Sequence, residues 1–266
     1  MMEQRAGKSI KAVFFDVDGT LVSFNTHQIP ASNLSAIQRL QQKGIRVIVA
    51  TGRSINTIQN VSHIPFDGFI TFNGGCCVAT DGRLLSLTSI DPGNIQNLLE
   101  YSGLEPLSFS LMYKDKVTIN DVTPEVVGMY AHVNLPVPPV IDRSNVDMDG
   151  VLQANIFIGP EGQDQFMQRV MPDCIATRWT PLFADVNPAG VSKQSGIDVF
   201  CQEFGIDVSQ TMAFGDGGND ISMLRHAGIG VAMGSASAEV VASADYHTVD
   251  VDDDGILKAL EHFGVL

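Results

Sequence analysis

The sequence is poor in basic residues and contains no long apolar run. It has 16 lysines and arginines against 30 aspartates and glutamates in 266 residues, so the formal net charge at pH 7 is −14. Such a chain repels nucleic-acid phosphates and anionic lipid headgroups. No stretch approaches the roughly 18 apolar residues of a membrane-spanning helix, and residues 1–10 lack the apolar core of a signal peptide. We expect a cytoplasmic protein without nucleic-acid or membrane partners.

Several common chemistries have no signature in the sequence. The four cysteines, at positions 76, 77, 174 and 201, form no C-x-x-C pattern, so neither a disulfide framework nor a zinc site is indicated. The motifs of a P-loop, a serine-hydrolase nucleophile elbow and a zinc metalloprotease are absent. The glycine pattern at 228–234 has three residues where a dinucleotide fingerprint has two, which argues against a dinucleotide cofactor.

The apolar residues that are present predict a parallel sheet. Hydrophobic residues make up 44% of the chain, and short apolar runs end abruptly at polar or glycine corners. This is typical of buried strands in an α/β sheet. The runs are 12–15, 47–50, 70–72, 212–214 and 231–233, with helices expected over about 32–43, 191–204 and 220–227. Because ligands bind beyond the carboxyl ends of parallel strands, these corners should converge.

The segment 76–188 has a different, α+β pattern. We expect turns at 81–82 and 114–115, helices over 92–103, 124–134 and 161–171, strands over 108–112, 117–119 and 152–158, and a last strand pair through Arg178 and Ala184. The only tryptophan, Trp179, is expected to pack inside this segment or to stack on a ligand. The predicted fold class is α/β. A Rossmann-like parallel-sheet core comprises residues 1–75 and 189–266, and residues 76–188 form an inserted α+β domain.

Two acidic clusters occupy ends of predicted strands. In FDVDGT, residues 15–20, Asp16 and Asp18 are two positions apart, and crowding of like charge there is unfavourable without a cation. In GDGGND, residues 215–220, Asp216 and Asp220 supply hard oxygen ligands of the kind that Mg²⁺ prefers. Each cluster by itself also fits an ordinary turn or loop.

Two further strand-end or helix-start features suit an anion. Thr51, Gly52 and Arg53 bring a hydroxyl and backbone N–H groups to the end of the second run, as a phosphate seat requires. Lys193 lies at the start of a helix in an acid-rich chain. A lone lysine is usually a solvated surface group, and Thr-Gly alone is a turn. The agreement of these features at strand ends indicates a combined metal and phosphate site.

In this order, the motifs resemble those of the haloacid dehalogenase-like phosphotransferases. Within that family, they resemble the motifs of the Cof-type sugar phosphatases, which carry a large α+β cap of the C2B type. The motifs are D-x-D-G-T at 16–20, T-G-R at 51–53, Lys193 and G-D-x-x-N-D at 215–220. One difference is that family members often have glycine directly after the motif lysine, whereas Gln194, Ser195 and Gly196 follow here.

The resemblance implies roles for individual residues. Asp16 would be the nucleophile that forms an aspartyl-phosphate, and Asp18 the general acid and then base. Mg²⁺ would be held by Asp16, the backbone carbonyl of Asp18 and Asp216, with Asp220 nearby. The substrate's phosphoryl group would be bound by a set that comprises Thr51, Gly52, Lys193 and Asn219, and Arg53 is counted among the substrate-binding residues.

Three functions follow as hypotheses. The first is a Mg²⁺-dependent phosphatase that hydrolyses small phosphorylated metabolites, above all sugar (hexose) phosphates. The second is a sugar phosphomutase of the same superfamily, which the core motifs do not separate from a phosphatase. The third is a non-catalytic sugar-phosphate sensor, which the intact Asp16 and Asp18 disfavour.

Overall fold

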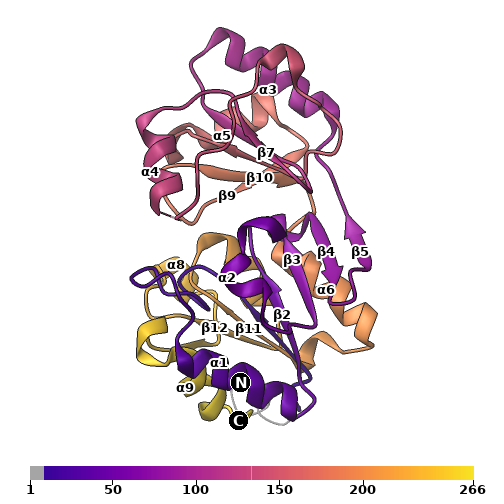
Figure 1. The fold of residues 1–266 in the computed structure, drawn as a ribbon, viewed down its shortest axis with the longest axis vertical. Helices are drawn as coiled ribbons and strands as arrows, with labels where there is room; N and C mark the ends of the chain where they lie inside the picture. The colour runs from indigo at the N-terminus through magenta and orange to yellow at the C-terminus, as the bar shows by residue number, and fades with distance from the viewer. Residues whose placement is uncertain (1–8, 133) are drawn as a thin grey trace. The chain divides into compact units, whose positions relative to one another are not determined.

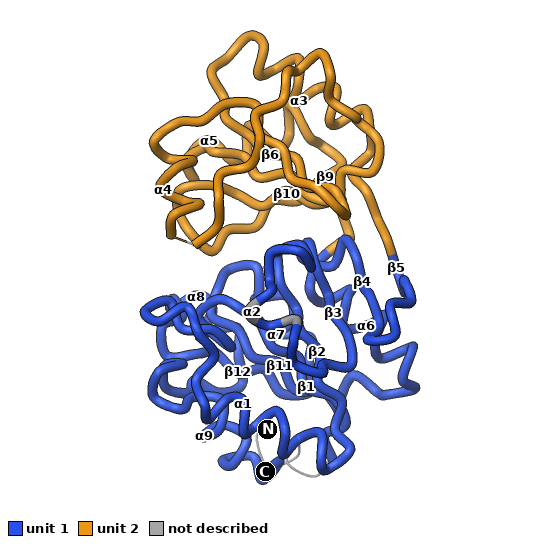
Figure 2. The backbone as a smooth tube through the Cα atoms, in the orientation of Figure 1, with its two compact units in different colours: residues 1–86, 192–266 blue, residues 87–191 orange. Residues whose placement is uncertain are grey.

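A computed structural model describes residues 9–132 and 134–266, which form two compact units (Figure 2). One unit comprises the described residues up to Ser86 together with Ser192–Leu266, and the other comprises Leu87–Val191. The insert expected from the sequence begins at residue 76, whereas the second unit begins at Leu87. The difference arises because the two strands that begin at Cys76 and Leu84 pair within the sheet of the first unit. The division into a core and an inserted domain at 75/76 and 188/189 stays a prediction.

The first unit is built on an eight-stranded sheet in the order β13-β12-β11-β1-β2-β3-β4-β5. Figure 1 labels β12, β11, β2, β3, β4 and β5 of this sheet. The six strands from β13 to β3 pair in parallel, and β4 pairs antiparallel to β3. The strands are β1 (Ala12–Phe15), β2 (Arg46–Ala50), β3 (Gly68–Thr71), β4 (Cys76–Ala79), β5 (Leu84–Leu87), β11 (Thr211–Gly215), β12 (Ile229–Ala232) and β13 (Tyr246–His247). The parallel core sheet expected from the five apolar runs is confirmed.

Both faces of this sheet are covered by helices, which explains why its central strands β1, β2, β11 and β12 are mostly apolar and buried. Val13 and Phe15 of β1 pack with α1 (Ala31–Gln42) and α9 (Gly255–His262) on one face. Phe14 packs on the other face with α6 (Lys193–Phe204) and α7 (Ile221–His226). The short helices α2 (Gln59–Ser62) and α8 (Ala238–Val241) complete the unit.

Helix α6 carries the predicted lysine and has strong end signals. Ser192 and Ser195 form a capping box at its start, and Gly205 ends it in the left-handed conformation. A Cβ on Gly196 would lie 2.5 Å from a side-chain carbon of Ile70 in β3. Gly196, which follows the motif lysine at a greater distance than in the family pattern, therefore lies where α6 packs closely on the sheet.

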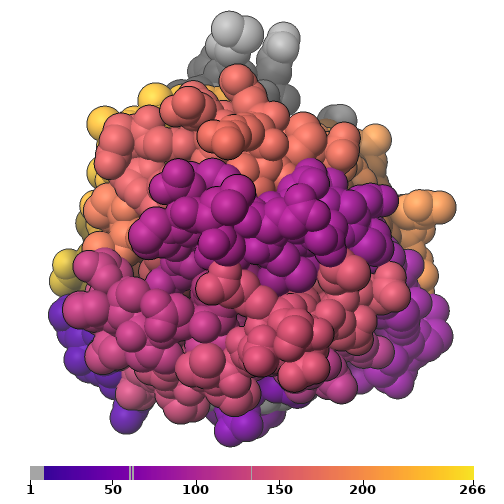
Figure 3. All heavy atoms as spheres, turned by 90° about the horizontal axis from the view of Figure 1, so that it is seen from above, coloured from indigo at the N-terminus to yellow at the C-terminus, as the bar shows by residue number. Residues whose placement is uncertain are grey.

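The second unit is an antiparallel five-stranded sheet in the order β7-β6-β8-β10-β9. Its strands are β6 (Phe109–Met112), β7 (Val117–Ile119), β8 (Gln153–Ile156), β9 (Cys174–Thr177) and β10 (Ala184–Pro188), and its helices are α3 (Pro92–Leu104), α4 (Pro124–His132) and α5 (Pro160–Val170). Figure 3 shows purple atoms from the early part of this unit beside salmon atoms from its later part. The expected α+β architecture is confirmed, although Arg178 lies just beyond β9 and outside the strand.

Trp179 belongs to the apolar packing of the second unit. Its ring centroid lies 5.4 Å from that of Phe183 and 6.0 Å from that of His132. These contacts agree with the expectation that the tryptophan packs inside the segment. Within the part of the chain that the structure describes, no helix is long and apolar enough to cross a membrane.

Candidate active site

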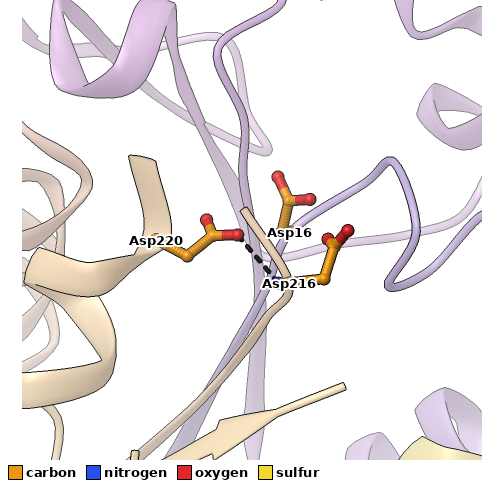
Figure 4. Close-up of side chains that lie close together, drawn as sticks. All are labelled: Asp16, Asp216 and Asp220. Atoms are coloured by element: carbon orange, nitrogen blue, oxygen red, sulfur yellow. Dashed lines mark hydrogen bonds between the residues drawn. The ribbon is translucent and has the colours of Figure 1, made fainter. Parts of the chain in front are cut away.

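Carboxylates from two neighbouring parallel strands meet at one edge of the core sheet. Asp16 directly follows β1, Asp216 directly follows β11, and Asp220 lies just before α7. One carboxylate oxygen from each of the three lies within 4.8 Å of the others (Figure 4). The strand-end positions inferred from the sequence therefore bring both acidic motifs together.

The turn after β1 is shaped to bring Asp216 close. Gly19 has a φ of +75°, which favours glycine, and a Cβ there would lie 2.4 Å from Oδ2 of Asp216. Buried Thr20 donates a hydrogen bond of 3.2 Å from Oγ1 to Oδ1 of the same aspartate. Gly19 and Thr20 of the first motif thus position the carboxylate of Asp216, which belongs to the last motif.

Lys193 lies at the centre of the charged cluster and is fully buried. Its Nζ donates hydrogen bonds of 2.5 Å to Oδ1 of Asp16 and to Oδ1 of Asp220. Burial opposes the charge on the ammonium, yet the two carboxylates and their hydrogen bonds raise the pKa of Lys193 above its ordinary value. The lysine is therefore a buried cation, not a solvated surface group.

The acidic side chains outweigh the charge of this lysine. Burial, followed by the charge of Asp220, raises the pKa of Asp16 to about 7 even though Lys193 acts in the opposite direction. Burial and the neighbouring carboxylates also raise the pKa of Asp216 well above its ordinary value. A cation bound between these oxygens would stabilise their ionised forms, so the donor set fits a hard divalent metal.

Asp220 organises the loop after β11. Its Oδ2 accepts a hydrogen bond of 3.0 Å from the backbone N–H of Asp216 (Figure 4). The same oxygen accepts one of 2.9 Å from the N–H of Gly217, while Oδ1 accepts from Lys193. Both oxygens of this fully buried carboxylate are therefore engaged. Asp16 and Asp216 are left as the side chains best able to bind a metal.

The loop after β2 contributes Thr51, Gly52 and Arg53. Thr51 is buried, its Oγ1 accepts a hydrogen bond of 3.1 Å from the backbone N–H of Arg53, and its carbonyl accepts one of 3.0 Å from Asn73. Asn219 donates from Nδ2 to Oδ1 of Asn73 at 3.0 Å. The sequence marks Asn73 only as a polar corner after the third apolar run, and its contact with the last motif depends on the fold.

Arg53 contacts the second aspartate of the first motif. Its Nε lies 2.7 Å from Oδ2 of Asp18, and its Nη2 lies 2.6 Å from Oδ1. Its Nη1 donates to the backbone carbonyl of Thr57 at 3.4 Å. The expectation from the sequence was that Arg53 is a substrate-binding residue, and nothing in the sequence indicated its pairing with Asp18.

The family follows from a comparison of the whole sequence. The sequence profile of the haloacid dehalogenase-like hydrolases matches residues 13–260. The chain belongs to this family. It is 31% identical over 259 residues to YkrA of Bacillus subtilis, a phosphatase by name, in an alignment that covers 96% of this chain and 98% of YkrA.

Solved structures of the family agree with this assignment. The phosphatase BT1666 of Bacteroides thetaiotaomicron has a TM-score of 0.90 and 39% identity, with 97% of this chain and 96% of that chain covered. The subclass IIB sugar phosphatase BT4131 has a TM-score of 0.91 and 38% identity, with 96% of this chain and 100% of that chain covered. The resemblance seen in the motifs is confirmed: this haloacid dehalogenase-like hydrolase is a Cof-type phosphatase.

Proposed function

We propose that the chain is a Mg²⁺-dependent phosphatase of small phosphorylated metabolites, with hexose phosphates as the substrate class and an aspartyl-phosphate as the intermediate. The observation that carries the proposal is the placement of Asp16, which accepts a hydrogen bond from buried Lys193 and has a carboxylate oxygen within 4.8 Å of one of Asp216. The sugar phosphatase BT4131 supports the choice of substrate class. The relative YcsE of Bacillus subtilis, 26% identical, is named a 5-amino-6-(5-phospho-D-ribitylamino)uracil phosphatase, which also supports a small phosphorylated metabolite.

The metal would be held by Asp16 and Asp216, with the backbone carbonyl of Asp18 as the third protein ligand. Asp220 would stay outside the metal's ligand set, because both of its oxygens already accept hydrogen bonds. When bound, Mg²⁺ would neutralise negative charge between the nucleophile and the phosphate.

The side chains of the first motif would carry out the bond changes. A carboxylate oxygen of Asp16 attacks phosphorus and the bond to the leaving oxygen breaks, while Asp18 gives its proton to that oxygen. Asp18 then takes a proton from water, the water oxygen attacks the phosphorus, and the carboxylate of Asp16 is released with inorganic phosphate. Lys193 holds Asp16 in place throughout through the hydrogen bond to Oδ1.

The phosphoryl oxygens would be bound by Thr51, Gly52, Lys193 and Asn219. An ammonium has three N–H donors, and Asp16 and Asp220 account for two of those on Lys193. The third can donate to the transferring group, where negative charge develops. The side chain of Asn219 is oriented for the same purpose by Asn73.

The subcellular location and the absence of macromolecular partners are also proposals. We propose a cytoplasmic enzyme that acts without nucleic-acid or membrane partners, which the net charge of −14 supports. All four cysteines lie within the described residues and none forms a disulfide, in keeping with a reducing compartment.

The proposal is tested by measuring inorganic phosphate released from a panel of hexose, pentose, nucleotide and polyol phosphates. We expect turnover of hexose phosphates with Mg²⁺, no turnover in EDTA, and none in the folded Asp16→Asn variant, whose amide cannot form the acyl-phosphate. Release without a bisphosphate activator separates a phosphatase from a phosphomutase. Activity that survives chelation, or full activity of Asp16→Asn, would overturn the mechanism.

A further inference from the structure

We infer that Arg53 is a positioning residue that orients the general acid and base Asp18, and that its guanidinium does not bind the transferring phosphoryl group. The inference rests on the proposed function, because it concerns the step in which Asp18 protonates the leaving oxygen. It changes the role expected from the sequence, in which Arg53 belongs to the substrate-binding residues.

The contact between the two side chains is bidentate. Nε and Nη2 of Arg53 each donate to a different oxygen of Asp18, at 2.7 and 2.6 Å. The side chains are 16% and 22% exposed, so solvent screens the pair less than it screens a surface ion pair. Paired parallel bonds of this kind fix the plane of a carboxylate as well as its distance. The pair therefore removes the rotational freedom that Asp18 would otherwise have.

Local structure holds the arginine in place before it meets Asp18. Its backbone N–H donates to Oγ1 of Thr51, its carbonyl accepts from the N–H of Phe72, and its Nη1 donates to the carbonyl of Thr57. Thr57 is itself bonded through Oγ1 to the carbonyl of Ser54 at 3.0 Å. These hydrogen bonds orient the loop that follows β2 and the guanidinium group that it carries.

Orientation matters for the proposed role of Asp18. A general acid acts only when its proton lies within hydrogen-bond reach of the leaving oxygen, and such assistance typically contributes about 10²- to 10⁴-fold in rate. Lys193 holds the Asp16 carboxylate in place through a hydrogen bond, and the guanidinium of Arg53 holds the Asp18 carboxylate through two. A lysine at position 53 would keep the positive charge but lose the planar fork.

The alternative role as a phosphoryl ligand predicts different behaviour. A ligand of the phosphoryl group contributes whether or not Asp18 can act as an acid. A residue that works through Asp18 contributes nothing once Asp18 is removed, and contributes little when the leaving group needs no proton. A double-mutant cycle with two leaving groups separates these cases.

The first arm of the test compares kcat/KM for hexose 6-phosphate and for p-nitrophenyl phosphate, whose leaving group needs little acid assistance. We expect Arg53→Met to lower the value for the hexose phosphate by about 10²-fold and the value for p-nitrophenyl phosphate by much less. Arg53→Lys should resemble Arg53→Met, since the fork is lost. Arg83→Met is the matched control, because Arg83 also pairs with carboxylates but on the surface, and it should leave both values unchanged.

The second arm measures the pre-steady-state burst of p-nitrophenolate in Asp18→Asn. Adding Arg53→Met to that background should change the burst rate by less than about twofold. A further loss of about 10²- to 10³-fold would show that Arg53 binds the phosphoryl group, and so would equal losses for the two substrates in the first arm. Wild-type phosphate release reports the proposed function by itself, so failure of the inference about Arg53 is distinguishable from failure of that function. Thermal melting verifies that each variant is folded.

Discussion

At the scale of single residues, the main feature of the site is that its buried carboxylates outnumber the cationic side chains that contact them. Lys193 forms hydrogen bonds with Asp16 and Asp220, but Asp216 adds a further acid to the same cluster. Burial strengthens every charge interaction there because little water remains to screen it. Changes that remove the lysine, or that protonate the acids, should therefore affect both stability and turnover.

Replacing Lys193 with Met should impair the enzyme in two ways. Loss of one donor to the transferring group typically lowers the rate by about 10²- to 10³-fold. The change also leaves Asp16 and Asp220 buried without their cation, and breaking a buried pair in this way typically costs about 3–5 kcal/mol. Phosphate release and thermal melting measure the two effects. Exposed Lys258→Met is the control, and a Lys193→Met variant as stable and active as that control would contradict the assignment.

The pKa of Asp16 predicts how stability depends on pH and metal. The folded-state value of about 7 lies above the ordinary 3.8, so the metal-free folded protein binds this proton more tightly than the unfolded chain. The stabilising contribution is present at the lowest pH and is lost as the pH rises from 3.8 to about 7. The same direction holds for Asp216.

In EDTA, the melting temperature of the wild type should fall over that pH interval relative to the melting temperature of Asp16→Asn. The variant lacks the titratable carboxyl at position 16 and therefore does not lose this contribution to stability. Mg²⁺ favours the ionised carboxylates, so the increase in melting temperature that it produces should be larger above pH 7 than below. A difference between wild type and Asp16→Asn that stays constant with pH would contradict the assignment of the raised pKa.

At the scale of elements, the turn after β1 decides whether the loop after β11 can come close. Gly19→Ala introduces a Cβ 2.4 Å from Asp216, in a backbone conformation that disfavours alanine. We expect the Mg²⁺ concentration for half-maximal activity to rise, because Asp216 must move away. The matched control is Gly82→Ala, which has a φ of +83° but open space around its Cβ.

Both alanine variants strain the backbone, so both should melt at a lower temperature than wild type. Only Gly19→Ala should change the metal requirement. Titration of activity with Mg²⁺ distinguishes them, and equal half-maximal concentrations for Gly19→Ala and Gly82→Ala would contradict the steric role of Gly19.

At the scale of the whole molecule, we propose that a core and an inserted domain fold as separate units. The described chain divides into two units, each with its own buried cluster, and every contributor to the candidate site belongs to the unit built on the parallel sheet. Trp179, the only tryptophan, belongs to the other unit. Its emission can therefore report the unfolding of its own unit while a ligand stabilises the unit that contains the candidate site.

Mg²⁺ should raise the urea midpoint of the core's contribution to the far-UV circular dichroism signal and leave the Trp179 emission midpoint unchanged. A ligand stabilises only the cooperative unit that binds it. Coincident transitions that shift together with Mg²⁺ would contradict separate folding of the two units.

The sequence by itself determined where the chemistry lies. Asp16, Thr51 and Asp216 each follow an apolar run, and the carboxyl ends of parallel strands share one edge of a sheet, so local pattern was enough to predict their convergence. The lysine required the family motif as well, since one ammonium in an acid-rich chain carries no local signal of burial.

Only the tertiary structure decided which partners these residues have. The bond of Arg53 with Asp18 spans 35 positions in the sequence, and that of Asn219 with Asn73 spans 146. The pairing of β4 with β3, which places the strand that begins at Cys76 in the core sheet, likewise depends on the tertiary structure. Strand and turn patterns record local backbone preference and burial, whereas the choice of one polar partner among several depends on distances that exist only after the strands have paired and the helices have packed.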